Sequence, residues 1–211
     1  QDERKKLIEK KIENICKVKN MKNNFDQNLI NEVVNLVEKP NVIVCKFNEV
    51  YLNIPREILI VTMQHHQKYF PLFDEGNKLT NLFILVANLQ DKKGFIKTGN
   101  QRVIEARLSD AKFFWEKNKR QNLVKQVGKL KNLLFFNQLG TFFDRTQRLR
   151  KLAPLISDQL NISKEKIEIA SSICKADLVS DLVGEYPELQ GVMGKYFAKE
   201  QGFENDVALA I

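Results

Sequence analysis

Few residues in this chain have the types and spacing that catalysis needs. His65 and His66 are the only two histidines, and they are adjacent, so on a helix they would point about 100° apart and could hardly share one metal ion. Cys16, Cys45 and Cys174 are far apart, with no metal-binding or disulfide pattern. Glycine-rich phosphate loops and zinc-protease motifs are absent from the sequence. We therefore predict no catalytic residue and no metal ligand, and we expect the cysteines to lie in the core of a reduced, cytoplasmic protein.

Basic residues are the stronger candidates, because they are unevenly distributed. The net charge is +8, and residues 101–150 hold 12 Lys and Arg against 4 Asp and Glu. This distribution is typical of a surface that binds a polyanion, although a solvated helix face would look the same. The candidate phosphate-binding residues are Lys68, Arg102, Arg107, Lys112, Lys125, Lys129, Arg145 and Arg148. Arg107 could instead pair with Asp110 or Glu105.

Aromatic residues lie among these basic ones, at 65–71 and 112–115. Such residues can stack on unpaired bases. Burial in the core is the more common role of large aromatics, and we expect it for Phe70, Phe114 and Trp115.

The first half of the chain has the pattern of a small mixed sheet with helices. β-branched and aromatic runs predict strands at 42–45, 68–73 and 81–88, the last two joined by a turn at 74–77. Helices are predicted at 2–15, from a cap at Asp26 to just before Pro40, and at 56–64 after Pro55. The composition, with 43% hydrophobic residues, supports a real core, and no apolar run is long enough for a membrane span.

The second half has helical periodicity. Thr98 and Gln101 match a capping box, and Ile104, Leu108 and Trp115 follow on one helical face. Further helices are predicted at 123–134, 142–160, 164–183 and from 188. We therefore predict an α+β chain in which a small α/β domain precedes an all-helical one. The expected domains are a helical lead-in at 1–40, an α/β domain at 41–116 and a helical domain at 117–211, with the first and last truncated.

Four stretches resemble one known family. They are Asn-Leu-Val-Glu-Lys-Pro at 35–40, Met63 to Pro71, Gly99 to Trp115, and a set that runs from Leu139 to Gly194 and includes Lys-Ala-Asp-Leu-Val at 175–179. In this order they are similar to the beta subunit of the bacterial two-subunit glycyl-tRNA synthetases. Three residues depart from the family pattern: Glu105, Asn118 and Arg145.

The resemblance implies a role shared with other parts of an enzyme. The family's alpha subunit holds the glycine and ATP site, so ATP and Mg would act there, with no cofactor in this fragment. The implied partners are glycine-specific tRNA and the alpha subunit, in a cytoplasmic heterotetramer without a membrane. The family-motif residues, with structural or binding roles, are His66, Tyr69, Phe70, Asn100, Asp110, Trp115, Glu188 and Gln190.

The resemblance also implies a fold for each half. The first half is similar to a tRNA-synthetase α/β accessory domain of the editing type, and the second to an HD-type phosphohydrolase fold. An HD metal site needs histidines, yet residues 101–211 contain none, so we expect an HD-like domain whose metal site has degenerated. Asp144 and Asp177 would remain as helix caps or salt-bridge partners.

These observations favour a tRNA-recognition and assembly portion of a glycine–tRNA ligase, non-catalytic by itself. Two alternatives stay open. One is a structural module that docks the alpha subunit without touching tRNA, and the other is an HD-type phosphohydrolase.

Overall fold

The computed structural model describes residues 1–160 and 163–211. These form two compact units, Gln1–Lys112 and Phe113–Ile211. Helices predominate, with a three-stranded sheet in the first unit and a two-stranded sheet in the second. The α+β class predicted from sequence is therefore confirmed. None of the described helices is long and apolar enough to cross a membrane.

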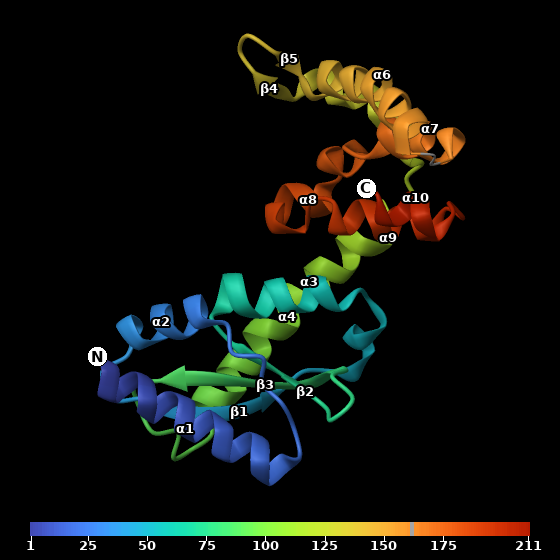
Figure 1. Cartoon of the computed structure of the whole chain (residues 1–211). Helices are drawn as coiled ribbons and strands as arrows, with labels where there is room; N and C mark the ends of the chain where they lie inside the picture. The colour runs from blue at the N-terminus through green and yellow to red at the C-terminus, as the bar shows by residue number, and fades with distance from the viewer. Residues whose placement is uncertain (161–162) are drawn as a thin grey trace. The chain divides into compact units, whose positions relative to one another are not determined.

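The first unit is built on an antiparallel sheet (Figure 1). Its strands are β1 (Asn41–Lys46), β2 (Phe70–Phe73) and β3 (Leu79–Ala87), in the order β1-β3-β2. The three strands match the sequence predictions within two residues at every end. The helices around them are α1 (Asp2–Lys19), α2 (Gln27–Leu36), η1 (Glu49–Asn53), α3 (Arg56–Val61), the π-helical η2 (Thr62–His66) and the first part of α4 (Phe95–Asn118).

One face of this sheet is covered by α1 and α2. Asp26 caps α2 as predicted, since its carboxylate accepts hydrogen bonds from the backbone N–H of Asn28 and Leu29. The buried cluster joins Ile8 and Ile12 of α1 with Val33 of α2 and with strand residues. Residues 1–40 therefore share a core with the sheet.

The other face carries Phe83, whose ring lies 4.8 Å from the ring of Tyr69. In Figure 1, α4 crosses on the far side of the sheet. Its predicted apolar face is confirmed, because Ile104, Leu108 and Ala111 are fully buried.

The start of α4 differs from the prediction. Thr98 and Gln101 do not form a capping box, since the helix begins at Phe95. Asp91 supplies the cap instead, because its carboxylate accepts hydrogen bonds from the N–H groups of Ile96 and Lys97. Gly94, at a φ of 74°, lets the chain turn between Asp91 and the first residue of α4.

The second unit follows the end of α4. Its elements are α5 (Leu123–Gln126), η3 (Val127–Asn132), β4 (Leu134–Phe136), β5 (Gly140–Thr141), α6 (Phe142–Leu160), α7 (Lys164–Ile173), η4 (Ala176–Val179), α8 (Asp181–Glu185), η5 (Pro187–Leu189), α9 (Val192–Glu200) and α10 (Asn205–Leu209). The helix at 142–160 agrees with the prediction, Pro154 included.

The all-helical expectation for this part of the chain is wrong. Residues 134–141 form a β-hairpin, and the helix predicted to reach Leu134 breaks at Val127 and ends in a 3-10 turn at Asn132. Gly140 sits at a φ of 78°, which a hairpin turn accommodates and a helix does not. The helix predicted at 164–183 is also broken, because Ser180 caps the separate helix α8.

Candidate nucleic-acid interface

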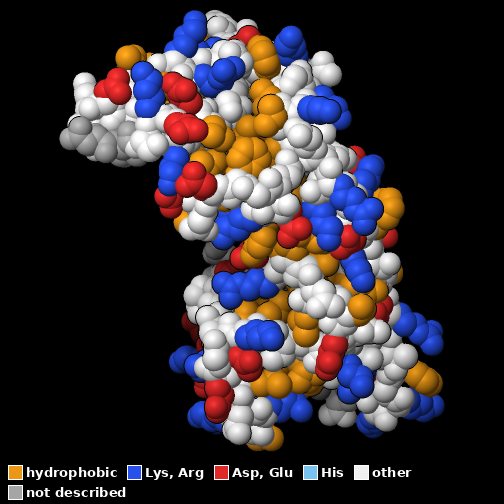
Figure 2. All heavy atoms as spheres, turned by 90° about the vertical axis from the view of Figure 1, so that its right-hand side faces the viewer, with side chains coloured by type: hydrophobic (Ala, Val, Ile, Leu, Met, Phe, Trp, Pro, Cys, Tyr) orange, Lys and Arg blue, Asp and Glu red, His pale blue; other side chains and the backbone are white. Residues whose placement is uncertain are grey.

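The eight basic candidates divide equally between the two units. Those in the first unit are Lys68, Arg102, Arg107 and Lys112, and those in the second are Lys125, Lys129, Arg145 and Arg148. On the face shown in Figure 2, Lys and Arg side chains are interspersed with acidic and hydrophobic ones. Because acidic side chains lie among the basic ones, the best candidates for phosphate binding are the Lys and Arg side chains that have no acidic partner.

Lys68 is not one of them. Its ammonium lies 2.8 Å from a carboxylate oxygen of Glu32, which joins the end of η2 to α2. Its backbone has a φ of 57°, in the left-handed region, which ends the helical turn before β2. Lys68 therefore has a structural partner that competes with phosphate.

The three α4 candidates have no such partner in the described part of the chain. Arg102 and Arg107 are exposed, and Lys112 is half-buried. Neither acid that the sequence suggested for Arg107 pairs with it there. Glu105 instead accepts a hydrogen bond of 2.6 Å from the backbone N–H of Asn48. The α4 guanidinium groups remain available to an external anion.

The second-unit candidates lie on α5, η3 and α6. Lys125 and Lys129 are exposed and form no ion pair within the described residues. The Arg145 guanidinium lies over the rings of Phe135 and Phe142, 4.4 and 5.9 Å from their centroids. Arg148 is exposed on the same helix.

Other lysines of the second unit differ because they are paired. Lys117 lies 2.8 Å from Asp181, and Lys119 lies 2.8 Å from Glu116. Lys166 contacts two carboxylates, and these hydrogen bonds hold its pKa above its usual range. Only Glu116 and Lys119 have a local helical spacing, and the partners in the other pairs are far apart in the chain.

Two family motifs meet in the first unit through Tyr69 and Asn100. The Tyr69 hydroxyl donates a 2.6 Å hydrogen bond to Asn100 Oδ1, and the Asn100 amide donates to the carbonyl of Ile96. Burial raises the pKa of Tyr69 to about 12. Phe70 is also buried, as predicted, whereas His66 is exposed. Tyr69 and Asn100 thus tie α4 to the sheet.

Replacing Tyr69 by phenylalanine tests this tie. We expect the free energy of unfolding to fall by about 1–2 kcal/mol, because the change leaves Asn100 Oδ1 without its donor while the ring packing persists. Urea denaturation of the two proteins measures the difference. An unchanged midpoint and slope would show that the hydrogen bond contributes nothing.

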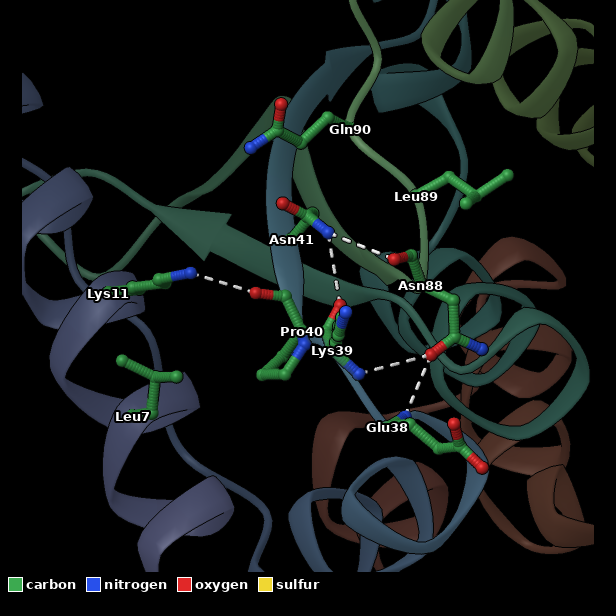
Figure 3. Close-up of a pocket in the computed structure, with 9 residues that line it drawn as sticks. All are labelled: Leu7, Lys11, Glu38, Lys39, Pro40, Asn41, Asn88, Leu89 and Gln90. Atoms are coloured by element: carbon green, nitrogen blue, oxygen red, sulfur yellow. Dashed lines mark hydrogen bonds between the residues drawn. The ribbon is translucent and has the colours of Figure 1, made fainter.

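The Asn-Leu-Val-Glu-Lys-Pro motif lies beside a pocket of about 540 Å³ (Figure 3). Asn88 Oδ1 accepts hydrogen bonds from the backbone N–H groups of Glu38 and Lys39, and Asn41 donates to the carbonyls of Lys39 and Asn88. Lys11 donates to the carbonyl of Pro40. These bonds hold the chain between α2 and β1 against the end of β3, which is a structural role for the motif.

Asp177 links two parts of the family-like set in the second unit, residues 175–179 and the segment that ends at Gly194. Its side chain is fully buried, and Oδ2 accepts hydrogen bonds from the N–H groups of Gly191 and Gly194, at 2.6 and 3.2 Å. Of the two roles expected for Asp177, helix cap or salt-bridge partner, the structure shows the cap, because Asp177 caps α9 from a distant segment. Gly194 suits this position because a Cβ there would clash with the Ile211 side chain and would lie 3.3 Å from the carboxylate carbon. Gly191, at a φ of 78°, provides the turn that precedes α9.

Asp144 is also a cap, which is one of the two roles expected for it. Its carboxylate accepts hydrogen bonds from the N–H and hydroxyl groups of Thr141, and these bonds lower its pKa. The Thr141 hydroxyl in turn accepts a bond from the Asp144 N–H, so the pair fixes the start of α6.

The remaining motif residues have varied surroundings. Trp115 is buried and stacks on Phe197. Asp110, Glu188 and Gln190 are exposed.

The described residues of the second unit do not provide a metal site of the HD kind. Among the described residues, no three or more His, Cys, Asp or Glu side chains are arranged to hold a metal ion. Asp177 and Asp144 use their carboxylates for backbone caps, and the three cysteines are buried. The donor set therefore does not fit a metallohydrolase.

Asn118 is a structural residue for which the sequence suggested no role. It is 1% exposed, and its Oδ1 accepts a hydrogen bond from the N–H of Leu182 while its amide donates to Asp181. The only signal was its departure from the family pattern.

Comparisons with known proteins agree with the motifs. A family model described as glycyl-tRNA synthetase beta subunit matches residues 1–211. The chain is 42% identical to a glycine–tRNA ligase beta subunit of Thermodesulfovibrio yellowstonii over 212 residues, covering 100% of this chain and 31% of that protein. It is 43% identical to the protein of the same name from Stutzerimonas stutzeri, covering 99% of this chain and 31% of that protein. The chain thus spans about a third of the length of these curated relatives.

Proposed function

Because the chain belongs to the glycyl-tRNA synthetase beta-subunit family, we propose that it is a tRNA-holding portion of a glycine–tRNA ligase. The observation that supports this role is the set of exposed or half-buried basic side chains, on α4 in the first unit and separately on α5 in the second, that have no acidic partner in the described part of the chain. Phosphate contacts by such side chains supply affinity without sequence specificity and position the nucleic acid.

In this proposal, the catalytic chemistry of the ligase takes place in other parts of the enzyme. Glycine-specific tRNA and the alpha subunit are the proposed partners, in a heterotetramer. ATP and Mg are proposed to act at the alpha subunit, as the family resemblance implies. The second unit is proposed to be an HD-like scaffold, an assignment supported by the motif resemblance alone.

Neutralising the unpaired side chains tests the proposed function. A variant with glutamine at Arg102, Arg107, Lys112 and Lys125 should bind glycine-specific tRNA at least about tenfold more weakly at low salt. The slope of log affinity against log salt should also decrease by about one for each phosphate that the variant no longer neutralises. Filter binding over a range of salt concentrations measures both.

The matched control neutralises four exposed lysines elsewhere, at Lys10, Lys78, Lys92 and Lys164. It removes the same charge, so an equal reduction in affinity would show that only net charge matters. If the test variant binds tRNA as tightly as the unchanged chain, the proposed interface is wrong. If it instead fails to bind the alpha subunit, the docking-module alternative is supported.

A further inference from the structure

The β4–β5 hairpin exposes an apolar face. Leu134 is 62% exposed and Phe136 is 59% exposed, and Leu139 in the turn is 51% exposed. Side chains alternate along a strand, so Leu134 and Phe136 share the face opposite Phe135. No described residue covers this face, and exposed apolar side chains gathered together indicate a binding surface.

The opposite face fixes the hairpin to α6. The ring of Phe135 meets the ring of Phe142 edge-on, with centroids 5.3 Å apart. The Arg145 guanidinium lies 4.4 Å from the Phe135 centroid, and the Phe142 N–H donates to the carbonyl of Leu133. The exposed face is therefore presented by an anchored element, which lowers the entropy that binding would cost.

The surroundings of the hairpin are basic. Residues 128–150 contain five Lys and Arg and one acid, Asp144. Asp144 directs its carboxylate to Thr141, and the Lys131 ammonium lies over the ring of Phe143 at 4.8 Å. Arg145 forms no ion pair with any residue that the structure describes. Exposed apolar side chains within a segment rich in Lys and Arg suit a partner that combines flat apolar groups with negative charge.

We propose that this face binds a single-stranded segment of RNA, with Phe136 stacked on an unpaired base. Lys129, Lys131 and Arg148 would contact the flanking phosphates. An unpaired nucleotide offers both a π-face and a phosphate, and stacking on an aromatic side chain tolerates any base. The inference rests on the proposed function and adds to it a second contact, one made with unpaired nucleotides rather than with the helical backbone.

Two RNA probes separate this contact from general phosphate binding. One is a blunt RNA stem-loop, and the other is the same stem-loop with a short single-stranded 3′ extension. The unchanged chain should bind the extended probe more tightly. Phe136→Ala should weaken binding of the extended probe about tenfold and leave the blunt probe unaffected, because the change removes only the stacking on the base. Phe136→Trp should retain the preference.

Phe95→Ala is the matched control, because Phe95 is 73% exposed in the first unit. It should bind both probes like the unchanged chain. Equal affinity of the unchanged chain for the two probes would overturn the hairpin inference while the proposed function stands. The hairpin inference is equally overturned if Phe136→Ala keeps the preference for the extended probe, or if that variant fails only to bind the alpha subunit. Failure of the unchanged chain to bind either probe would refute the proposed function and this inference together.

Discussion

Replacing Trp115 by alanine is expected to destabilise the second unit by about 3–5 kcal/mol. Trp115 is 4% exposed, stacks on Phe197 with ring centroids 5.8 Å apart, and meets Tyr196 edge-on at 6.1 Å. Removing the indole would leave a cavity where the end of α4 packs against α9. Because Trp115 is the only tryptophan, far-UV circular dichroism in urea should follow unfolding rather than fluorescence.

Phe113→Ala provides the comparison on the same helix. Phe113 is 63% exposed, so its replacement should change the free energy of unfolding by less than about 0.5 kcal/mol. A Trp115→Ala chain that unfolds like the unchanged one but binds tRNA more weakly would contradict the core assignment. It would make Trp115 a stacking residue instead.

Asp177→Ala should have the next largest effect, about 2–4 kcal/mol. The change removes the acceptor for the Gly191 and Gly194 N–H groups and leaves two donors at the start of α9 unsatisfied. Asp177→Asn keeps an acceptor of the same shape and should retain most of the stability. If the two variants unfold at the same urea concentration, the remote cap does not support α9.

The pH dependence gives an independent check on Asp177. Burial raises the pKa of its carboxyl, and Oδ1 is buried without a hydrogen-bond partner among the described residues. The folded state therefore keeps the proton to higher pH than the unfolded state, and this residue's contribution to stability falls as pH rises from about 4 through the raised pKa. The stability of Asp177→Asn relative to the unchanged chain should increase over the same range.

Asp144 offers a control of opposite sign. The hydrogen bonds from Thr141 lower its pKa, so its contribution is present above the ordinary carboxyl pKa and disappears as pH falls through the lowered value. Asp144→Asn should therefore be less stable than the unchanged chain at neutral pH, and the difference should shrink on acidification. If the stabilities of the two Asn variants relative to the unchanged chain changed in the same direction with pH, the role assigned to one of the two carboxyls would be wrong.

Local patterns predicted most elements of the first unit. The β-branched run at 42–45 and the cap at Asp26 each act over a few residues, and the structure contains both. The Thr98 prediction failed because Asp91, seven residues earlier, supplies a competing cap. The hairpin at 134–141 was missed because Leu134 fits both a helical face and a strand, and only packing of Phe135 against Phe142 decides between them.

Residue identity and order were enough to establish the family, the basic segment and the lack of histidine in the second half, because these features do not depend on how the chain folds. The pairing of the cations and the targets of the remote caps came from the fold instead. Lys68 and Lys166 find carboxylates on other elements, and Asp177 reaches backbone groups 14 and 17 residues away. Ion pairs and remote caps form between segments that the fold brings together, so no local pattern in the chain reports them.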